Sequence, residues 1–305
     1  MDGVIIINKP HGCTSHDIVY KVKKIVNKKV GHTGTLDPMA QGVLPLLIGK
    51  GTLCSKYLIN HDKIYQVELT LGIKTDTADG EGKIIEEKEL IDENIKKEKV
   101  QETLQSFKGK QKQIPPMYSA IKVKGKKLYE YARKGQEVQI EPREIEIYSI
   151  TLDALNKNKI QFTVSCSKGT YIRSLCEDIA EKLGTVGYMS KLNRIKVGEF
   201  DIKEAINIEE FEKLENREQK REYINKKIIS IEKLFMFYPQ IMLPKEKLTQ
   251  FLNGVKLEIP VKCIENCKEK SIVNCENTLF RVYTEGKFIG IATMQNKLLK
   301  RDIIL

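Results

Sequence analysis

The 305-residue sequence contains no tryptophan, only nine prolines and no glycine- or serine-rich tract, and 41% of its residues are apolar. This composition can form a hydrophobic core and argues against a disordered chain. The longest apolar runs, such as 4–7 and 43–48, reach about half a dozen residues, whereas a membrane-spanning helix needs about 20. The N-terminus lacks a basic start followed by an apolar stretch, so we expect neither a membrane association nor a signal peptide.

Cysteine is scarce as well, with seven scattered residues, an odd number. Reduced thiols in a cytosol are the simplest interpretation, so we expect a cytoplasmic protein. Cys263, Cys267 and Cys275 form no C-x-x-C pair and have no histidine nearby, and the four histidines show no metal-ligand spacing. The sequence therefore predicts no metal site.

Positive charge is in excess, since 52 Lys and Arg residues face 41 Asp and Glu residues, for a net charge of +11. Residues 76–102 carry ten acids and five lysines, whereas 108–135 carry nine basic residues and one acid. Residues 1–60 carry eight lysines and three acids. A uniformly lysine-rich chain would not concentrate its charge in this way. The distribution favours a polyanionic partner, of which nucleic acid is the commonest.

The hydrophobic pattern predicts a mixture of strands and helices, an α+β chain. Alternating apolar residues predict strands at 4–7, 65–71, 145–152 and 159–166 and a hairpin at 280–292. Helical spacing predicts helices after the Thr14/Asp17 capping signature, near 95–107, after residue 170 and across 208–234. The stretch 30–47 is dense in glycine and proline and is interpreted as a loop, and 75–82 as a surface turn. From about Ile241, short strands separated by turn residues indicate a second, small all-β domain.

Residues 110–142 combine basic and aromatic side chains. Two adjacent prolines, Pro115 and Pro116, break any helix there. The basic residues that stand among the tyrosines are Lys122, Lys124, Lys126, Lys127 and Arg133. Cations that meet phosphates beside rings that stack on bases suit single-stranded or looped RNA. An exposed hairpin with a short helix explains the same pattern equally well.

Two charged residues are candidates for a functional site, but neither is sufficient evidence for one by itself. Asp37 lies in a Thr-Leu-Asp-Pro segment flanked by glycines, and Asp-Pro is a common turn dipeptide. Arg173 lies at the turn into a predicted helix, where it could simply pair with a helix carboxylate. Taken singly, each residue has an ordinary structural explanation.

Together with their surroundings, these residues resemble the TruB family of tRNA pseudouridine synthases. The resemblance runs in order through blocks at 8–12, 31–45, 63–65, 115–120, 124–129, 168–173 and 192–195. The Gly-His-Thr-Gly-Thr-Leu-Asp-Pro block at 31–38 is its most specific part. The blocks together span residues 1 to about 200, and beyond residue 240 the match is loose.

The resemblance implies a fold and a domain organisation. Residues 1–238 would form the catalytic domain, a pseudouridine synthase fold with a central mixed, largely antiparallel sheet flanked by helices. An insertion at about 110–142 would clamp the RNA. Residues 239–305 would form a small PUA-like RNA-binding β-domain.

The activity that the resemblance implies is a cofactor-free isomerisation. Uridine-55 in the T-loop of tRNA becomes pseudouridine: the N-glycosidic bond is cut, the uracil turns in place, and a carbon–carbon bond forms to the same ribose. The partner would be the T-arm of tRNA, and the family suggests a monomer.

By the same resemblance, Asp37 would be the nucleophile and Arg173 its partner. A carboxylate can attack the sugar carbon or add to the uracil ring, and the residue types leave both routes open. Burial in a dry pocket would raise the pKa of Asp37, and a nearby guanidinium would oppose that shift. Lysine would replace Arg173 poorly, because it lacks the planar fork.

The resemblance also assigns contacts to a flipped base. Tyr65 would stack on the uracil, and its hydroxyl is a candidate for handling the C5 proton. Leu192 would pack on the other side, Tyr171 would lie near the base, and His32 would fill the gap left in the RNA. Without the resemblance, Tyr65 and Leu192 would be interpreted as core residues. The residues expected to support the nucleophile's loop are Lys9 and Pro10.

Two alternatives remain open. A non-catalytic tRNA-binding or tRNA-folding protein on the same scaffold would be expected to lack the nucleophile or the arginine, and both are present. A guide-RNA-dependent pseudouridine synthase subunit would be an enzyme with different targeting. The 110–142 insertion favours a stand-alone tRNA enzyme.

Overall fold

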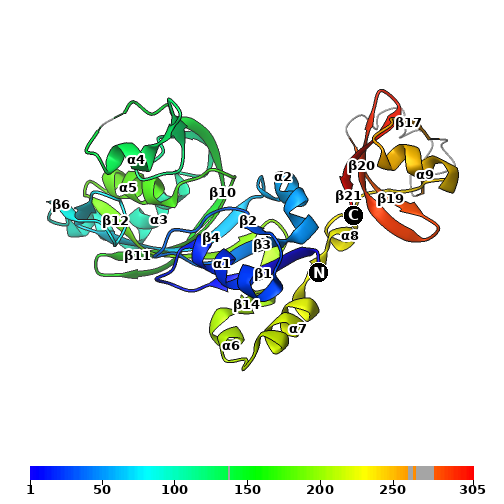
Figure 1. Ribbon diagram of the computed structural model, residues 1–305. Coiled ribbons are helices and arrows are strands. Elements are labelled where there is room, and N and C mark those ends of the chain that lie inside the picture. The colour runs from blue at the N-terminus through cyan, green and yellow to red at the C-terminus, as the bar shows by residue number, and fades with distance from the viewer. Residues whose placement is uncertain (137, 260–263, 266–277) are drawn as a thin grey trace.

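The computed structural model describes residues 1–136, 138–259, 264–265 and 278–305 (Figure 1). Cys263, Cys267 and Cys275, which the sequence excluded as a zinc site, lie outside the described residues, as does residue 137 of the basic segment. Within the described ranges, the strands form one eleven-stranded sheet, one six-stranded sheet and two small two-stranded sheets. No helix in these ranges is both long enough and apolar enough to cross a bilayer.

The large sheet is mixed and largely antiparallel, as expected for the α+β fold class. Its order is β14 (Ile206–Asn207), β1 (Gly3–Lys9), β3 (Gln41–Ile48), β12 (Gly187–Val197), β4 (Lys63–Leu71), β11 (Lys159–Cys166), β10 (Arg143–Asn156) and β7 (Gly109–Gln113). The strands β2 (Val30–His32), β13 (Phe200–Asp201) and β15 (Ile229–Ser230) pair with β3, β12 and β1. Among the described strand pairs of this sheet, only β1–β14 and β3–β12 are parallel.

Three helices cover one face of this sheet: α1 (Ser15–Val26), α3 (Lys97–Gln105) and α5 (Ile172–Lys182). The start of α1 confirms the capping prediction, because Thr14 and Asp17 form a reciprocal capping box. The apolar faces of α1 and α5 enter one continuous core with β3, β4 and β12, and Ile18 and Ile179 are completely buried there. Burial of these faces, more than helix propensity, stabilises the helices.

The described chain also contains the remaining helices and the two small sheets. The helices are α2 (Ser55–Leu58), α4 (Leu128–Ala132), α6 (Ile208–Glu212), α7 (Arg217–Lys227), α8 (Ile231–Leu234) and α9 (Lys245–Leu252), with 3₁₀ turns at Gly49–Cys54, Asp92–Ile95 and Ile202–Glu204. The two-stranded sheets pair β5 (Ile73–Thr75) with β6 (Ile84–Glu87), and β8 (Lys122–Val123) with β9 (Lys126–Lys127).

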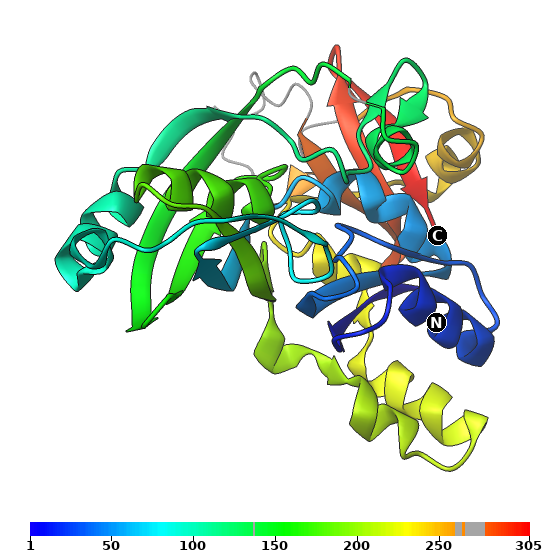
Figure 2. The ribbon, with the colours of Figure 1, turned by 90° about the vertical axis from the view of Figure 1, so that its left-hand side faces the viewer.

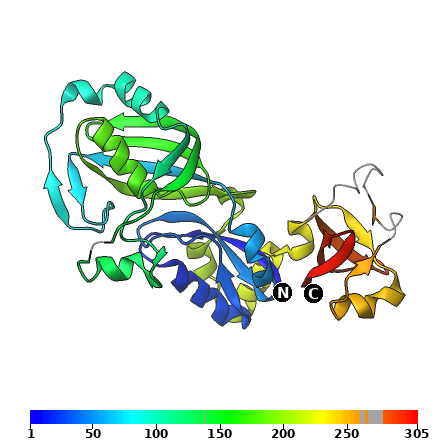
Figure 3. The same cartoon turned by 90° about the horizontal axis from the view of Figure 1, so that it is seen from above.

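The second sheet confirms the expected C-terminal β-domain. Its order is β17 (Leu257–Glu258), β21 (Leu298–Ile304), β20 (Lys287–Gln295), β19 (Leu279–Thr284), β16 (Gln240–Met242) and β18 (Ile264–Glu265). Figure 3 shows it beyond α8, at the end of the molecule away from α3. Phe235 and Ile231 of the α8 region join apolar residues of both sheets in one buried cluster. The boundary at 238/239 itself stays a prediction.

The predicted loop at 30–47 is wrong at its beginning and in its second half, because Val30–His32 is the strand β2 and Gln41–Ile48 is a central strand. Every residue of β3 after Gln41 is buried, and burial on both faces outweighs the local turn preference of glycine and proline. Pro45 lies between the residues of β3 that pair with β12 and those that pair with β2. Its carbonyl accepts from the N–H of Thr33 at 3.2 Å, and this position needs no N–H donor from the proline. The strand β12 and the helix α9 were not predicted; in β12, register shifts and a buried arginine hide the alternation.

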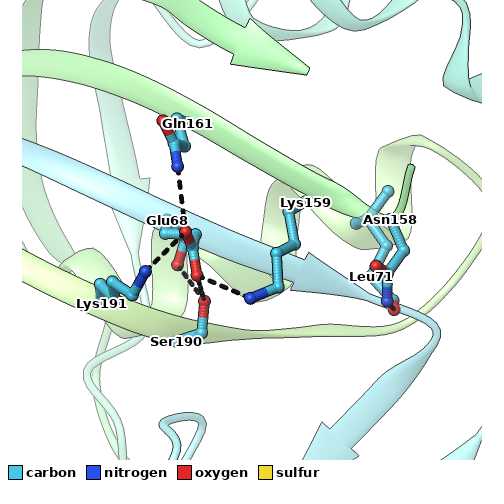
Figure 4. Close-up of polar contacts among 7 residues, drawn as sticks. All are labelled: Glu68, Leu71, Asn158, Lys159, Gln161, Ser190 and Lys191. Atoms are coloured by element: carbon cyan, nitrogen blue, oxygen red, sulfur yellow. Dashed lines mark hydrogen bonds and ion pairs between the residues drawn. The ribbon is translucent and has the colours of Figure 1, made fainter. Parts of the chain in front are cut away.

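A buried carboxylate fastens the three middle strands on the face opposite the helices. Glu68 of β4 is 4% exposed and lies among donors from β11 and β12 (Figure 4). Its oxygens accept from Gln161 Nε2 at 3.0 Å, Ser190 Oγ at 2.9 Å, Lys191 Nζ at 3.1 Å and Lys159 Nζ at 3.2 Å. Burial acts to raise the pKa of Glu68, but these hydrogen bonds outweigh it and lower the pKa from 4.5 to about 2.

This lowered pKa predicts a pH-dependent contribution to stability. A shift of this size is linked to about 3 kcal/mol of unfolding free energy, present in full above the unfolded-state pKa and lost as the pH falls towards the folded-state value. Between pH 4.5 and pH 2, the unfolding free energy of the wild type should therefore fall more steeply than that of Glu68→Gln. Urea unfolding at several pH values measures both. Glu86→Gln, at an exposed site on β6, is the control; parallel curves for wild type and Glu68→Gln would contradict the prediction.

Candidate active site

The loop that carries Asp37 joins β2 to β3 and is held by hydrogen bonds from α1 and from β1. From the start of α1, Ser15 Oγ donates to the carbonyl of Leu36 at 3.0 Å and accepts from its N–H at 2.9 Å. At the end of β1, the ammonium of Lys9 is completely buried and donates to three carbonyls, including that of Pro38 at 3.2 Å. One of the others is the carbonyl of Pro10, at 2.9 Å. The structure thus places Lys9 and Pro10 under the loop, where a supporting role was predicted.

Arg173 lies in the first turn of α5 and meets four acceptors. Its Nη2 lies 3.1 Å from Asp37 Oδ2, and its Nη1 lies 3.5 Å from Asp79 Oδ2. Nη1 also donates to the carbonyl of Thr77 at 3.2 Å, and Nη2 to the carbonyl of Tyr118 at 2.8 Å. The guanidinium side chain is 8% exposed, so it forms a buried bridge between two carboxylates. Only an arginine presents donors in such a fork.

Asp79 was not predicted as a site residue, and the turn at 75–82 is not the plain surface turn expected. Asp79 is 4% exposed, and its Oδ1 accepts from Thr77 Oγ1 at 2.6 Å and from the N–H of Glu81 at 3.1 Å. The turn is also bridged to β12, because Met189 N–H donates to the carbonyl of Ala78. The sequence pattern could not reveal this, since the charge partner of Asp79 lies far along the chain.

The electrostatics around Asp37 follow the expected balance. Burial raises the pKa of Asp37 above its ordinary value of 3.8, and the guanidinium of Arg173 opposes the rise. Asp79 raises the pKa further, whereas Lys9 and Arg194 lower it. The carboxyl side chain remains 38% exposed, so it is reachable from solvent while its partner is not. This combination gives a carboxylate that is held in place and open on one side.

A second buried arginine lies beside Tyr65. Arg194 of β12 is opposite Tyr65 of β4 in the sheet, on the same face. Arg194 is 1% exposed, and it donates to the carbonyls of Val43 at 2.8 Å and Gly34 at 2.7 Å. Burial raises the pKa of Tyr65, and Arg194 opposes that rise. Arg194 lay within the 192–195 block, but nothing local marks an arginine as buried.

The predicted base contacts surround the same region. Leu192, 8% exposed, lies opposite Val67 in the β12–β4 pair and shares the apolar core with Tyr65. Tyr171 is the half-buried residue that immediately precedes α5, two positions before Arg173. Tyr65 and Leu192 therefore lie on the helix-bearing face of the sheet, and Asp37 adds to the effect of burial in raising the pKa of Tyr65.

His32 ends β2, on the chain segment that leads to the Asp37 loop. Burial and the charge of Arg194 lower the pKa of His32, so the imidazole is neutral at pH 7. Among the described residues, its buried Nδ1 has no hydrogen-bond partner. A neutral ring is suited to stacking rather than to ion pairing.

The basic residues expected to clamp RNA lie on the β8–β9 hairpin and at the C-terminal end of α4, where Arg133 is the C-cap. Lys122, Lys124, Lys126 and Arg133 are exposed. Lys127 Nζ and the Arg133 guanidinium each lie 5.3 Å from the ring centre of Tyr129. The segment is thus an exposed hairpin with a short helix, and two cationic side chains lie against the ring of Tyr129. Its RNA-binding role stays a prediction.

Comparison with known proteins identifies two matching family models. Residues 22–172 match the model described as TruB family pseudouridylate synthase (N terminal domain). Residues 173–236 match the model described as tRNA pseudouridylate synthase B C-terminal domain. The two matches meet at Arg173, so the charged bridge to Asp37 joins the two matched regions.

Curated relatives match over nearly the whole chain. A protein of Clostridium kluyveri named tRNA pseudouridine synthase B is 44% identical over 293 residues, 95% of each chain. A protein of the same name from Alkaliphilus oremlandii is 52% identical over 219 residues, 72% of each chain. Among solved structures, an H/ACA RNP bound to a substrate RNA containing 2′-deoxyuridine includes a chain with TM-score 0.66 and 22% identity, covering 99% of this chain and 85% of its own. A Cbf5-Nop10-Gar1 complex gives TM-score 0.64 at 25% identity, with 99% and 83% coverage.

Proposed function

Since the chain belongs to the TruB family of pseudouridylate synthases, we propose that it converts uridine-55 in the T-loop of tRNA to pseudouridine with Asp37 as its nucleophile. Formation of pseudouridine in tRNA follows from the family and from its named relatives. The observation that supports the role of Asp37 is its half-open carboxylate, 3.1 Å from a buried guanidinium.

The chemistry is an isomerisation that needs no added reactant. The bond from N1 of uracil to C1′ of ribose breaks, a bond from C5 to C1′ forms, and the proton on C5 is replaced by one on N1. If the carboxylate of Asp37 adds to C1′, it displaces N1 of uracil and is itself displaced as C5 bonds to C1′; if it adds to C6, it is eliminated after the C5–C1′ bond has formed. Arg173 keeps the carboxylate ionised and oriented against the effect of burial. The hydroxyl of Tyr65 is our candidate for handling the C5 proton.

Access to a base in a folded T-loop requires flipping it out, at a cost of a few kcal/mol of lost stacking. Tyr65 and Leu192 share one face of the β4–β12 pair, where they would hold the uracil from two sides. Tyr171 would line the pocket near Arg173. His32 would stack in the RNA in place of the missing base; its ring is uncharged at neutral pH because burial lowers its pKa.

The hairpin and α4 of the 110–142 segment would hold the T-arm through its phosphates. Replacing Lys126, Lys127 and Arg133 together with Ala should weaken tRNA binding and flatten its salt dependence. The slope of log K against log salt should fall by about 0.7–0.9 for each phosphate that the variant no longer neutralises. Titrations of labelled tRNA at several salt concentrations measure both effects.

The matched control removes the same charge elsewhere. Arg221, Lys226 and Lys227 lie on α7, which is distant from α4 in both Figure 1 and Figure 2. Their triple Ala variant should bind tRNA with nearly the wild-type salt slope. If both triple variants change the slope equally, the 110–142 segment is an ordinary surface hairpin and binding depends on net charge alone.

The alternatives make different predictions. A protein that only binds or folds tRNA would keep its tRNA-binding or tRNA-folding activity in Asp37→Asn, because neither activity needs a nucleophile. A guide-RNA-dependent subunit would not modify a free T-arm. The stand-alone enzyme is favoured because relatives named tRNA pseudouridine synthase B are about 44% identical to this chain, whereas the chains matched in the H/ACA RNP and in the Cbf5-Nop10-Gar1 complex are 22% and 25% identical.

The domains, the oligomeric state and the location of the enzyme belong to the same proposal. We assign residues 1–238 to catalysis and 239–305 to a PUA-like domain that contacts RNA. We expect the enzyme to act as a monomer in the cytoplasm without a cofactor. Incubation with T-arm RNA and nucleoside analysis test the function, since an RNA with cytidine at position 55 should remain unmodified.

A further inference from the structure

Gln113, at the end of β7, makes a two-point contact with the start of α5. Its Nε2 donates to the carbonyl of Tyr171 at 3.0 Å, and its Oε1 accepts from the N–H of Tyr171 at 2.8 Å. The side chain is 5% exposed. Both polar ends of a buried amide are therefore satisfied by the backbone of one residue, the residue that precedes α5.

This contact holds the residue at which α5 begins. Tyr171 supplies no side-chain cap to the helix; its carbonyl also accepts from the N–H of Leu175 within α5, whereas its own N–H has its partner outside the helix. Gln113 is that partner, and Arg173 follows two residues later. The direction in which the guanidinium leaves the helix therefore depends on a glutamine from another strand.

Two further contacts tie the same two segments together. Ser174 Oγ donates to the carbonyl of Ile114 at 3.0 Å, and Arg173 Nη2 donates to the carbonyl of Tyr118 at 2.8 Å. Residues 113–118 thus run along the start of α5 and end against the guanidinium. The same segment leads directly into the basic hairpin.

The side chain of Gln113 is not needed to hold its own strand. β7 is already paired with β10 through the backbone, with Gln113 in register with Arg143. Within the described residues, the two hydrogen bonds of the amide both go to the start of α5 rather than to the sheet. Its contribution is therefore directed at the helix that carries Arg173.

We propose that Gln113 is a positioning residue for Arg173, which couples the RNA-holding segment 110–142 to the Asp37–Arg173 ion pair. This inference rests on the proposed function. When the hairpin holds RNA, the segment 113–118 is held with it, and the start of α5 keeps the guanidinium against the nucleophile. Small displacements matter at such a pair, because a misplacement of about 1 Å can cost about 100-fold in rate.

Single-turnover pseudouridine formation at saturating tRNA provides the test. In Gln113→Leu both hydrogen bonds are absent, and we expect the rate to fall about tenfold to 100-fold while the tRNA dissociation constant stays near the wild-type value. Gln113→Glu keeps an acceptor for the Tyr171 N–H but no donor for its carbonyl, so its rate should be intermediate. The control is Gln105→Leu in α3, where the amide donates to the carbonyl of Ile150, away from the start of α5.

A pH profile separates positioning from a general loss of stability. The charged groups that face Asp37 are Arg173, Asp79, Lys9 and Arg194. If Gln113→Leu loosens Arg173, the pKa of Asp37 rises because burial is less opposed. The acidic limb of the pH–rate profile should then move to higher pH in Gln113→Leu and stay in place in Gln105→Leu.

Thermal melting shows whether each variant is folded. If Gln113→Leu is not folded, the single-turnover rate and pH profile of Gln113→Glu are used instead. A wild-type rate in a folded Gln113→Leu, or an unshifted acidic limb, overturns the proposal. If neither variant folds, Gln113 is a structural residue and the proposal is equally overturned. Failure of the proposed function would look different, because the wild type itself would then form no pseudouridine.

Discussion

Asp37→Asn is expected to abolish pseudouridine formation while tRNA still binds. The amide has nearly the same size and keeps a contact to Arg173, but it cannot add to C1′ or C6 as a carboxylate does. The rate should fall by about 10⁴-fold or more, as for the loss of a nucleophile in other enzymes. Tritium release from tRNA labelled at C5 of uridine measures turnover, and titration of labelled tRNA measures binding.

The matched control for this variant is Asp201→Asn, which removes the carboxylate that caps the 3₁₀ turn at Ile202–Glu204. Asp201 accepts from the N–H of Lys203 and makes none of the contacts that hold the Asp37 loop, so only stability should change. A turnover rate in Asp37→Asn close to that of the wild type would remove Asp37 from the role of nucleophile. Loss of binding together with turnover would instead indicate that the loop no longer folds.

Arg173→Met is expected to lower both the free energy of unfolding and the turnover rate. In Arg173→Met, Asp79 remains as a buried carboxylate without its cation, because it is only 4% exposed. Breaking a buried pair by removing one partner costs about 3–5 kcal/mol. The free energy of unfolding should fall by about that amount, and turnover should be lost because Asp37 is no longer held ionised. Urea unfolding and single-turnover assays measure the two effects.

A double variant identifies the cause. In Arg173→Met combined with Asp79→Asn, the stranded charge is gone, so part of the lost stability should return while turnover stays absent. Equal unfolding free energies for the single and double variants would mean that the stranded carboxylate is not the cause. Arg173→Lys should also be slow, since a single ammonium cannot reach two carboxylates and two carbonyls as the guanidinium does.

Local patterns predicted the elements whose signals are local. Thr14 and Asp17 indicated the start of α1, and the alternation in 65–71 indicated β4. The strand β3 was not predicted, because Gly42 and Pro45 favour turns and only burial between β1 and β12 makes that stretch a strand. Packing between distant segments decided the structure there, and no window of sequence contains it.

The difference between local sequence signals and contacts between distant segments applies to the site as well. Asp37 and Arg173 were selected through the resemblance of blocks far apart in the chain, and the structure places them in contact. Asp79, Arg194 and Gln113 were missed because each is defined by a partner on another strand or helix. Charge and residue type can be seen in a sequence, whereas burial of a charge cannot.

Position-resolved mapping of pseudouridine tests the central claim most directly. Full-length tRNA is incubated with the wild type or with Asp37→Asn, and modified nucleotides are then located along the RNA. We expect pseudouridine at position 55 with the wild type and none with Asp37→Asn. Modification at position 55 by both proteins, or at no position by the wild type, would contradict this expectation.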